Sequence, residues 1–253
     1  DRNPIMMNPP FSSVDRRALL ALGVGGLTLG LSPAFAQTSD GAKPKIATIG
    51  AGRQGGALGT LFAKAGYQVM FSALDPDALK DLVAAAGPNT QAGTTAQAVA
   101  FGDVILIAVP YSAMEQIGRD FGSGLATKQL VLDISNPIGG RDGADLVKKI
   151  NDEGGAGLAT ARILPGARIV RAFNAINYAA LPRAAHRSGT PLGVPIAGDD
   201  QKAVALATAL IKDIGFEAVV VGGLAKGKYL VPGTPLAGEH TPDELRKIAA
   251  GLS

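Results

Sequence analysis

Short, almost uninterrupted apolar runs recur along this chain from residue 45 onward. They lie at residues 45–49, 68–71, 104–109, 130–134, 169–173, 194–197 and 218–221. A strand with one wet face alternates apolar and polar residues, whereas a strand covered on both faces is apolar throughout. The runs therefore predict strands of a parallel sheet that is buried between two layers of helices.

Segments with helical periodicity separate these runs. Asp75 and Pro76 predict a helix start, and the apolar stripe that follows ends at Gly87. A longer stripe begins after Asp200 and ends at Gly215. Strands that alternate with helices in this way indicate an α/β fold with a doubly wound parallel sheet of the Rossmann type.

The stretch GAGRQG at residues 50–55 follows the first predicted strand and opens a helix-like segment. At this place G-x-G-x-x-G is typical of dinucleotide binding. The first glycine permits a tight turn, the second lets a diphosphate approach the backbone, and the third lets helix and strand pack closely. Free N–H groups at the helix start favour a phosphate. The residues predicted to bind the cofactor here are Gly50, Ala51, Gly52, Arg53, Gln54 and Gly55.

The second predicted strand bears on the choice of dinucleotide. An NAD site usually carries an acidic residue at the end of this strand, where it holds the ribose 2′-hydroxyl. Residues 71–74 read Phe-Ser-Ala-Leu instead, and the next carboxylate, Asp75, is explained as a helix cap. Ser72 and Arg53 are candidate ligands of a 2′-phosphate, so the sequence favours NADP over NAD.

Residues 1–44 have a different character and are predicted to be an export signal and linker. Arg16 and Arg17 precede fourteen uncharged residues, Ala18 to Leu31, and an A-x-A pattern follows at residues 34–36. A bilayer span takes about 20 residues, so this segment is too short to be one. It resembles a bacterial twin-arginine signal. We therefore expect an exported or periplasmic protein that engages the twin-arginine export machinery; an N-terminal helix packed on the domain is the alternative.

Composition narrows the chemistry. The 253 residues include no cysteine and only two histidines, which excludes thiol catalysis and disulfides and leaves no expectation of a metal site. The formal net charge is +3, which gives no reason to expect nucleic acid as a partner. The predicted parts are the export segment 1–44, a dinucleotide-binding domain with an acceptor cleft at 45–228, and a small C-terminal extension at 229–253.

Four further stretches carry a family resemblance. They are DVILIAVPYSAMEQI at 103–117, LVLDISNPI at 130–138, ILPGARIVRAFNAI at 163–176 and PIAGDDQKAVALATALIKDIGFEAVVVGGL at 195–224. With the glycine motif, they make residues 45–232 resemble the NADP-dependent deazaflavin (coenzyme F420) oxidoreductases. The cytosolic domain of mammalian transmembrane metalloreductases is similar too. The resemblance implies NADP in the N-terminal sheet and a second ring system in a cleft over the nicotinamide.

The resemblance also implies roles for individual positions. The glycine motif would hold the diphosphate, residues 108–110 would lie against the nicotinamide ribose, and the next residue would start a helix. Residues 136–137 would lie beside the nicotinamide and residues 173–174 near the acceptor. One departure stands out, because relatives commonly have Ser-Arg around the 2′-phosphate where this chain has Ala73 and Leu74. The implied cofactor-binding residues beyond the glycine motif are Ala108, Val109, Pro110, Tyr111, Asn136, Pro137, Phe173 and Asn174.

Hydride transfer between stacked rings requires the reacting carbons to be held about 3–3.5 Å apart. Because the cofactor supplies the difficult chemistry, no acid–base pair is required. Asn136, Asn174 and Tyr178 are the candidate catalytic residues, as neutral polar groups suited to orienting the rings. We expect an NADP-dependent oxidoreductase whose partner is a deazaflavin, a flavin or another small redox acceptor.

Two alternatives remain open. One is a non-catalytic NADP-binding sensor or partner module, in which Tyr111 or the tail fills the acceptor cleft. The other is a reductase of small carbonyls or imines, which needs a proton donor such as Tyr178. Export of a folded protein also predicts that NADP is bound tightly before export. A homodimer fits this class, although nothing in the sequence requires one.

Overall fold

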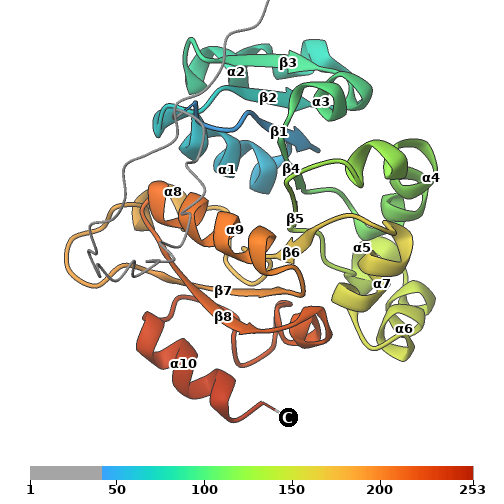
Figure 1. Ribbon diagram of the computed structural model, residues 1–253, viewed down its shortest axis with the longest axis vertical. Coiled ribbons are helices and arrows are strands. Elements are labelled where there is room, and N and C mark those ends of the chain that lie inside the picture. The colour runs from blue at the N-terminus through green and yellow to red at the C-terminus, as the bar shows by residue number, and fades with distance from the viewer. Residues whose placement is uncertain (1–41, 253) are drawn as a thin grey trace, which may run out of the picture. The chain divides into compact units, whose positions relative to one another are not determined.

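The computed structural model describes residues 42–252, which fall within one compact unit, Ala42–Ser253 (Figure 1). The predicted export segment, residues 1–44, therefore lies almost wholly outside the described residues. The predicted C-terminal extension belongs to the same compact unit as the dinucleotide-binding domain.

Within residues 42–252, eight strands form one sheet in the order β3-β2-β1-β4-β5-β6-β7-β8. β1 to β6 are parallel, β7 is antiparallel to β6, and β8 is parallel to β7. The strands are β1 Ile46–Ile49, β2 Val69–Ser72, β3 Thr90–Gly93, β4 Val104–Ile107, β5 Leu130–Asp133, β6 Ile169–Arg171, β7 Gly193–Gly198 and β8 Glu217–Gly222.

The predicted α/β sheet is confirmed, with two differences. Every predicted apolar run overlaps a strand, but β3 was missed because the edge strand Thr-Gln-Ala-Gly is only partly buried and shows no apolar run. The sheet is also not wholly parallel. The segment between β6 and β7 brings the chain back antiparallel, with Val170 opposite Gly198. A run that is apolar on both faces does not reveal its direction.

Helices cover both faces of the sheet (Figure 1). One core lies between the sheet and α1, α2, α8 and α9, and the other between the sheet and α3, α4, α6 and α7. A smaller core lies under α10. None of the helices within residues 42–252 is long and apolar enough to cross a membrane. The helices are α1 Arg53–Lys64, α2 Lys80–Ala86, α3 Thr95–Phe101, α4 Met114–Leu125, α5 Gly139–Asp142, α6 Ala144–Asp152, α7 Ala156–Ile163, α8 Leu181–Ala184, α9 Gln201–Asp213 and α10 Pro242–Ala250, with short 3₁₀ turns at Pro76–Leu79, Tyr111–Ala113 and Leu224–Tyr229.

The predicted helix caps are present. Asp75 accepts a hydrogen bond from the amide of Asp77, and Asp200 accepts one from the amide of Ala203. The start of α10 carries a further cap, a reciprocal capping box between Thr241 and Glu244. These short-range signals fix the helix starts independently of the core.

The strand order places a switch point between β1 and β4. The chain moves from β1 to β2 and β3 on one side, and then returns to β4 on the other side of β1. Ligands of doubly wound sheets bind at the carboxyl ends of strands at such a point. The loops after β1 and β4 begin there, at Gly50 and Ala108.

Candidate functional site

The glycine loop after β1 has the geometry of a diphosphate cradle. Gly50 has φ +88°, and a Cβ there would lie 2.6 Å from the carbonyl oxygen of Ala108. A Cβ on Gly55 would lie 2.1 Å from the carbonyl oxygen of Gly50, so this glycine allows α1 to pack on the loop. Gly52 is different, because a Cβ there would meet no protein atom within 4 Å. Packing requires the first and third glycines, while the second borders open space.

The start of α1 leaves backbone donors for a ligand. Gly52 is the N-cap residue and makes no side-chain cap, and the first turn holds no acidic residue. The first amides of a helix have no partner within the helix, so they can bind an anion. The amide of Ala51, by contrast, donates to the carbonyl oxygen of Ser72 at 2.9 Å. Ala51 therefore holds the turn, while the first amides of α1 remain available to an anion.

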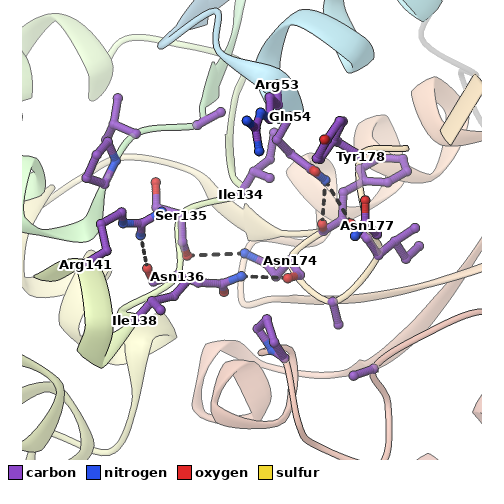
Figure 2. Close-up of a pocket in the computed structure, with 18 of the residues that line it drawn as sticks. Arg53, Gln54, Ile134, Ser135, Asn136, Ile138, Arg141, Asn174, Asn177 and Tyr178 are labelled. Carbon is purple, nitrogen blue, oxygen red and sulfur yellow. Dashed lines mark hydrogen bonds between the residues drawn. The ribbon is translucent and has the colours of Figure 1, made fainter. Parts of the chain in front are cut away.

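Two cavities meet at the loop Ala108–Pro110, which borders both. The β2-side cavity has a volume of about 660 Å³ and lies between the glycine loop, the end of β2 and α4. The β6-side cavity has a volume of about 650 Å³ and lies between the start of α1 and the segments that follow β5 and β6 (Figure 2). The two cavities therefore share one wall, the loop Ala108–Pro110, and the glycine loop borders the β2-side cavity.

The segment after β6 forms one wall of the β6-side cavity. Phe173 is buried and has φ +60°, a left-handed conformation that is rare for a bulky residue and concentrates at functional sites. The Gln54 side chain donates from Nε2 to the carbonyl oxygens of Phe173 at 3.0 Å and Ile176 at 3.2 Å (Figure 2). The glycine loop and the cavity wall are therefore connected directly.

Asn136 and Asn174 connect the ends of β5 and β6. Asn136 donates from Nδ2 to the carbonyl oxygen of Asn174 at 2.6 Å (Figure 2), and Asn174 donates from Nδ2 to the carbonyl oxygen of Asp133 at 3.0 Å. Asn136 also accepts at Oδ1 from Arg171 at 3.1 Å. Both amides therefore position the backbone, rather than extending freely into the cavity. Asn174 Oδ1 is buried and has no hydrogen-bond partner in the described part of the chain.

A buried ion pair stabilises the ends of β5 and β6, which Asn136 and Asn174 connect. Arg171 and Asp133 are fully buried, and Arg171 Nη1 donates to Asp133 Oδ2 at 2.5 Å. Arg171 also donates to the carbonyl oxygen of Ser135 at 3.0 Å, and Thr160 donates to the same Asp133 oxygen at 2.8 Å. A charge pair out of water is retained only with several such hydrogen bonds. The apolar pattern did not predict this pair, because Asp133 and Arg171 end strands that are otherwise apolar.

Tyr111 belongs to this interior rather than to the cofactor site. It begins the 3₁₀ turn that leads into α4, as predicted, but its ring is buried and lines neither cavity. Its hydroxyl lies 2.9 Å from Thr160 Oγ1 and donates to the carbonyl oxygen of Ala156. Burial and the nearby charge of Asp133 raise the pKa of Tyr111 well above its usual range. The prediction that Tyr111 contacts the cofactor is wrong.

The predictions that Ser72 and Pro137 contact the cofactor are also wrong. Ser72 is fully buried, and its hydroxyl donates to the carbonyl oxygen of Thr48 at 2.6 Å, so it is not available to a 2′-phosphate. Pro137 does not line the β6-side cavity; it borders a separate cavity under α6 and α7. Both residues lie next to site residues in the sequence, but neither side chain lines the two cavities.

Tyr178 and Arg53 form the exposed rim of the β6-side cavity. The Arg53 guanidinium carbon lies 5.6 Å from the centre of the Tyr178 ring, and both residues line this cavity. Asn177 also lines it, but its side chain accepts from the amide of Ala179 in a local turn. Arg53 therefore faces the β6-side cavity, whereas the sequence placed it beside a 2′-phosphate.

Arg141 is a cavity residue that sequence reasoning missed. It donates to the carbonyl oxygen of Asn136 at 2.6 Å (Figure 2) and pairs with the buried side chain of Asp142. Burial alone would raise the pKa of Asp142, but hydrogen bonds from Arg141, Ile138 and Ser112 outweigh it and lower the pKa to about 2. The ionised Asp142 thereby connects the segment after β5 to the start of α4.

Most predicted site residues lie together. The structure brings the glycine motif and residues 108–110 against the two cavities, and Gly55 packs behind them. Within residues 42–252, no cluster of acidic or histidine side chains is arranged to hold a metal ion. The predicted residues that line the β6-side cavity are Arg53, Gln54, Ala108, Val109, Pro110, Asn136, Phe173, Asn174 and Tyr178.

Solved structures share this fold. A hypothetical protein from Sinorhizobium meliloti is 25% identical over 79% of this chain and 96% of that chain, with a TM-score of 0.67. A protein from Arthrobacter sp. FB24 that is named for F420-dependent NADP reductase activity is 21% identical over 74% of this chain and 88% of its own, with a TM-score of 0.63. An imine reductase from Myxococcus stipitatus in complex with NAD+ is 20% identical, over 73% of this chain and 56% of that chain, with a TM-score of 0.52.

No curated protein sequence matches the chain. Residues 45–137 match the family model described as "NADP oxidoreductase coenzyme F420-dependent". The matched part contains the glycine loop, residues 108–110 and the end of β5, which line the β2-side cavity and part of the β6-side cavity. Residues 45–137 are thus similar, as the motifs predicted, to the coenzyme F420-dependent NADP oxidoreductases, a family of NAD(P)-dependent oxidoreductases.

Proposed function

We propose that this protein transfers a hydride between a bound nicotinamide dinucleotide and a small redox acceptor of the deazaflavin or flavin type. The observation that carries the proposal is the β6-side cavity, about 650 Å³ in volume, which lies next to the glycine loop. Small-molecule sites commonly have volumes of roughly 300–1,000 Å³ and occur at switch points of α/β sheets.

The residues present fit a dinucleotide. Gly52 leaves space for close approach, and the start of α1 offers free amides beside it. Asn174 Oδ1 is a buried acceptor without a partner among the described residues, and it belongs to a side chain that lines the β6-side cavity. An orphaned acceptor suits a ligand with an amide donor, such as a nicotinamide carboxamide.

The nicotinamide supplies the hydride chemistry when it is bound. The residues of this chain hold the two reacting rings in position. Hydrogen bonds among Arg171, Asn136 and Asn174 hold the segments after β5 and β6 that line the β6-side cavity. Gln54 connects the segment after β6 to the start of α1. Fixed geometry is what a reaction between two rings needs, because the reacting atoms must be held in near-attack contact.

The same cavity argues against a non-catalytic module. Such a module was expected to fill the acceptor space with Tyr111 or the C-terminal tail. Tyr111 is buried elsewhere, and Pro232, Gly233 and Ala237 of the tail border the β6-side cavity without closing it. The open space supports an enzyme that admits a second ring.

Acceptor screening tests the proposal. Purified protein is mixed under anaerobic conditions with NADH or NADPH and, separately, with a deazaflavin, FMN, a ferric chelate or a cyclic imine. Loss of the reduced nicotinamide absorbance with a ring acceptor supports the proposal. Absence of dinucleotide oxidation with every acceptor would defeat the enzymatic claim.

A carbonyl or imine reductase is the second candidate, and Tyr178 favours it. Tyr178 is 36% exposed and lines the β6-side cavity. Within residues 42–252 its hydroxyl makes no hydrogen bond that would occupy it. Reduction of a C=N or C=O bond requires a proton as well as a hydride, and Tyr178 is placed to donate one.

We also propose that the protein is exported through the twin-arginine route with its dinucleotide bound. The support is the sequence of residues 1–44, with Arg16 and Arg17 before an uncharged stretch. A variant with Arg16→Lys and Arg17→Lys should remain in the cytoplasm while the parent chain appears in the periplasmic fraction. Periplasmic protein purified without dinucleotide would contradict loading before export.

A further inference from the structure

We propose that the adenosine end of this site does not select for a 2′-phosphate, so that the protein binds NAD(H) at least as tightly as NADP(H), and that Leu74 sets this choice. The inference rests on the proposed dinucleotide site. It concerns the β2-side cavity, which has a volume of about 660 Å³ and borders Gly50, Ala51 and Gly52.

The two groups that favoured NADP are not in this cavity. The hydroxyl of Ser72 is fully buried and donates to the carbonyl oxygen of Thr48. Arg53 lines the β6-side cavity and lies over the Tyr178 ring. Neither side chain is therefore placed to bind a phosphate at the end of β2.

The end of β2 presents apolar side chains instead. Ala73 and Leu74 line the β2-side cavity directly after Ser72, and Leu79 lies beside them. Leu74 is fully exposed, at 104% of its reference surface. Relative to a doubly wound dinucleotide site, Ala73 and Leu74 occupy the place where an acidic residue or an arginine usually distinguishes NAD from NADP.

The charge in this cavity is unfavourable to a phosphate. Among the described residues that line it, none is Lys, Arg or His, and the one charged side chain is Asp120. The Asp120 carboxylate accepts from Gln116 Nε2 at 2.8 and 2.7 Å. A 2′-phosphate is secured by charge-assisted hydrogen bonds, and this wall offers no cation to make them.

Arg119 on α4 is the other cation to consider as a ligand of a 2′-phosphate. It does not line the β2-side cavity, and its guanidinium donates to Gln116 Oε1 at 2.6 Å, on the same side chain that holds Asp120. The two charges on α4 therefore offset one another. A ribose hydroxyl requires no counter-charge, so the lack of a cation in the β2-side cavity does not weaken the binding of NAD(H).

Binding measurements on the full chain test the inference. Calorimetry with NADH and NADPH gives the two dissociation constants for the parent protein and for Leu74→Arg. Because Leu74 is exposed, the substitution removes no packing. The matched control is Leu158→Arg on α7, at a position 39% exposed and outside both cavities. It adds the same charge elsewhere.

The expected result is a parent protein that binds NADH at least as tightly as NADPH. Leu74→Arg should tighten NADPH by about tenfold through a guanidinium–phosphate contact and leave NADH within about twofold. Leu158→Arg should change neither. This pattern would assign the choice of dinucleotide to the end of β2.

Two results would overturn the inference alone. One is a parent protein that binds NADPH tenfold more tightly than NADH, and loss of that preference in Arg119→Ala would then identify Arg119 as the phosphate ligand. The other is Leu74→Arg without any gain for NADPH. Binding of neither dinucleotide would instead overturn the proposed function, and this inference with it.

Discussion

The side-chain amide of Gln54 donates a hydrogen bond to the carbonyl oxygen of Phe173 at 3.0 Å. Gln54 lies in the first turn of α1, beside the glycine loop, and Phe173 lies at the left-handed turn after β6. These residues are 119 positions apart in the chain. One side chain therefore sets the spacing between the predicted diphosphate cradle and the wall of the acceptor cavity.

Replacing Gln54 by Ala should loosen that spacing. Two hydrogen bonds are lost, to Phe173 and Ile176, and each contributes about 0.5–1.5 kcal/mol. We expect the free energy of unfolding to fall by about 1–2 kcal/mol and turnover to fall more than dinucleotide affinity. Denaturant titration and steady-state kinetics measure both. Gln129→Ala, at an exposed position away from both cavities, is the control; equal effects of the two substitutions would contradict the connecting role.

The second and third glycines should respond differently to alanine. A Cβ at position 55 would lie 2.1 Å from the carbonyl oxygen of Gly50, so Gly55→Ala should lower the melting temperature. A Cβ at position 52 meets no protein atom within 4 Å, and Gly52 has φ −72°, which alanine adopts freely. Gly52→Ala should therefore keep its melting temperature and lose dinucleotide affinity. A Gly52→Ala variant that binds normally would contradict the cradle.

The fold was predictable because its signals are local. Apolar runs and the helix starts at Asp75 and Asp200 each depend on neighbouring residues, and all are confirmed. The reversal of β7 was not predictable, because the direction of a buried strand depends on where the preceding segment packs. β3 was missed because an edge strand needs no apolar run.

The site was predictable only in part, for a related reason. Glycines after β1 have a fixed role in the backbone, so sequence position was enough to place them. Ser72 and Tyr111 carry polar groups whose direction depends on the fold, and both turn inward to satisfy buried carbonyl oxygens. The Asp133–Arg171 pair is formed between two neighbouring strands, and the spacing of residues in the sequence does not predict such a contact.

Breaking the buried pair should be costly. Arg171→Met leaves the buried carboxylate of Asp133 without its counter-charge, and such losses destabilise by about 3–5 kcal/mol. A double variant, Arg171→Met with Asp133→Leu, should be less destabilised than the sum of the two single variants, because it removes both charges. Chemical denaturation of all four proteins completes the cycle. Strict additivity would show that the pair does not couple.

Asp142 should make stability depend on acid pH. Its pKa is lowered to about 2 in the folded chain, against about 3.9 when unfolded. A depressed pKa adds stability that is complete above about pH 4 and is lost as the pH falls toward 2. Asp142→Asn should therefore be less stable than the parent at pH 7, by about 2 kcal/mol, and the difference should shrink at pH 3.

Thermal unfolding across this pH range measures the Asp142 effect. The control is Asp152→Asn, which breaks an exposed ion pair with Lys148 and should change little at any pH. A gap between the parent and Asp142→Asn that stays constant from pH 7 to pH 3 would show that ionisation of Asp142 is not its cause.

Tyr178→Phe separates the two candidate reactions. Transfer of a hydride to a deazaflavin or flavin-type ring needs no protein proton donor, so removing the hydroxyl should leave that turnover within about twofold. Reduction of an imine or carbonyl depends on proton transfer, which contributes about 10²–10⁴-fold, and should fall accordingly. The phenylalanine keeps a ring under Arg53, so the rim of the cavity is preserved. Turnover of the Tyr178→Phe variant is measured with both acceptor classes. A loss of turnover confined to imines and carbonyls assigns the hydroxyl as proton donor. Unchanged turnover with both classes shows that Tyr178 takes no part in the chemistry.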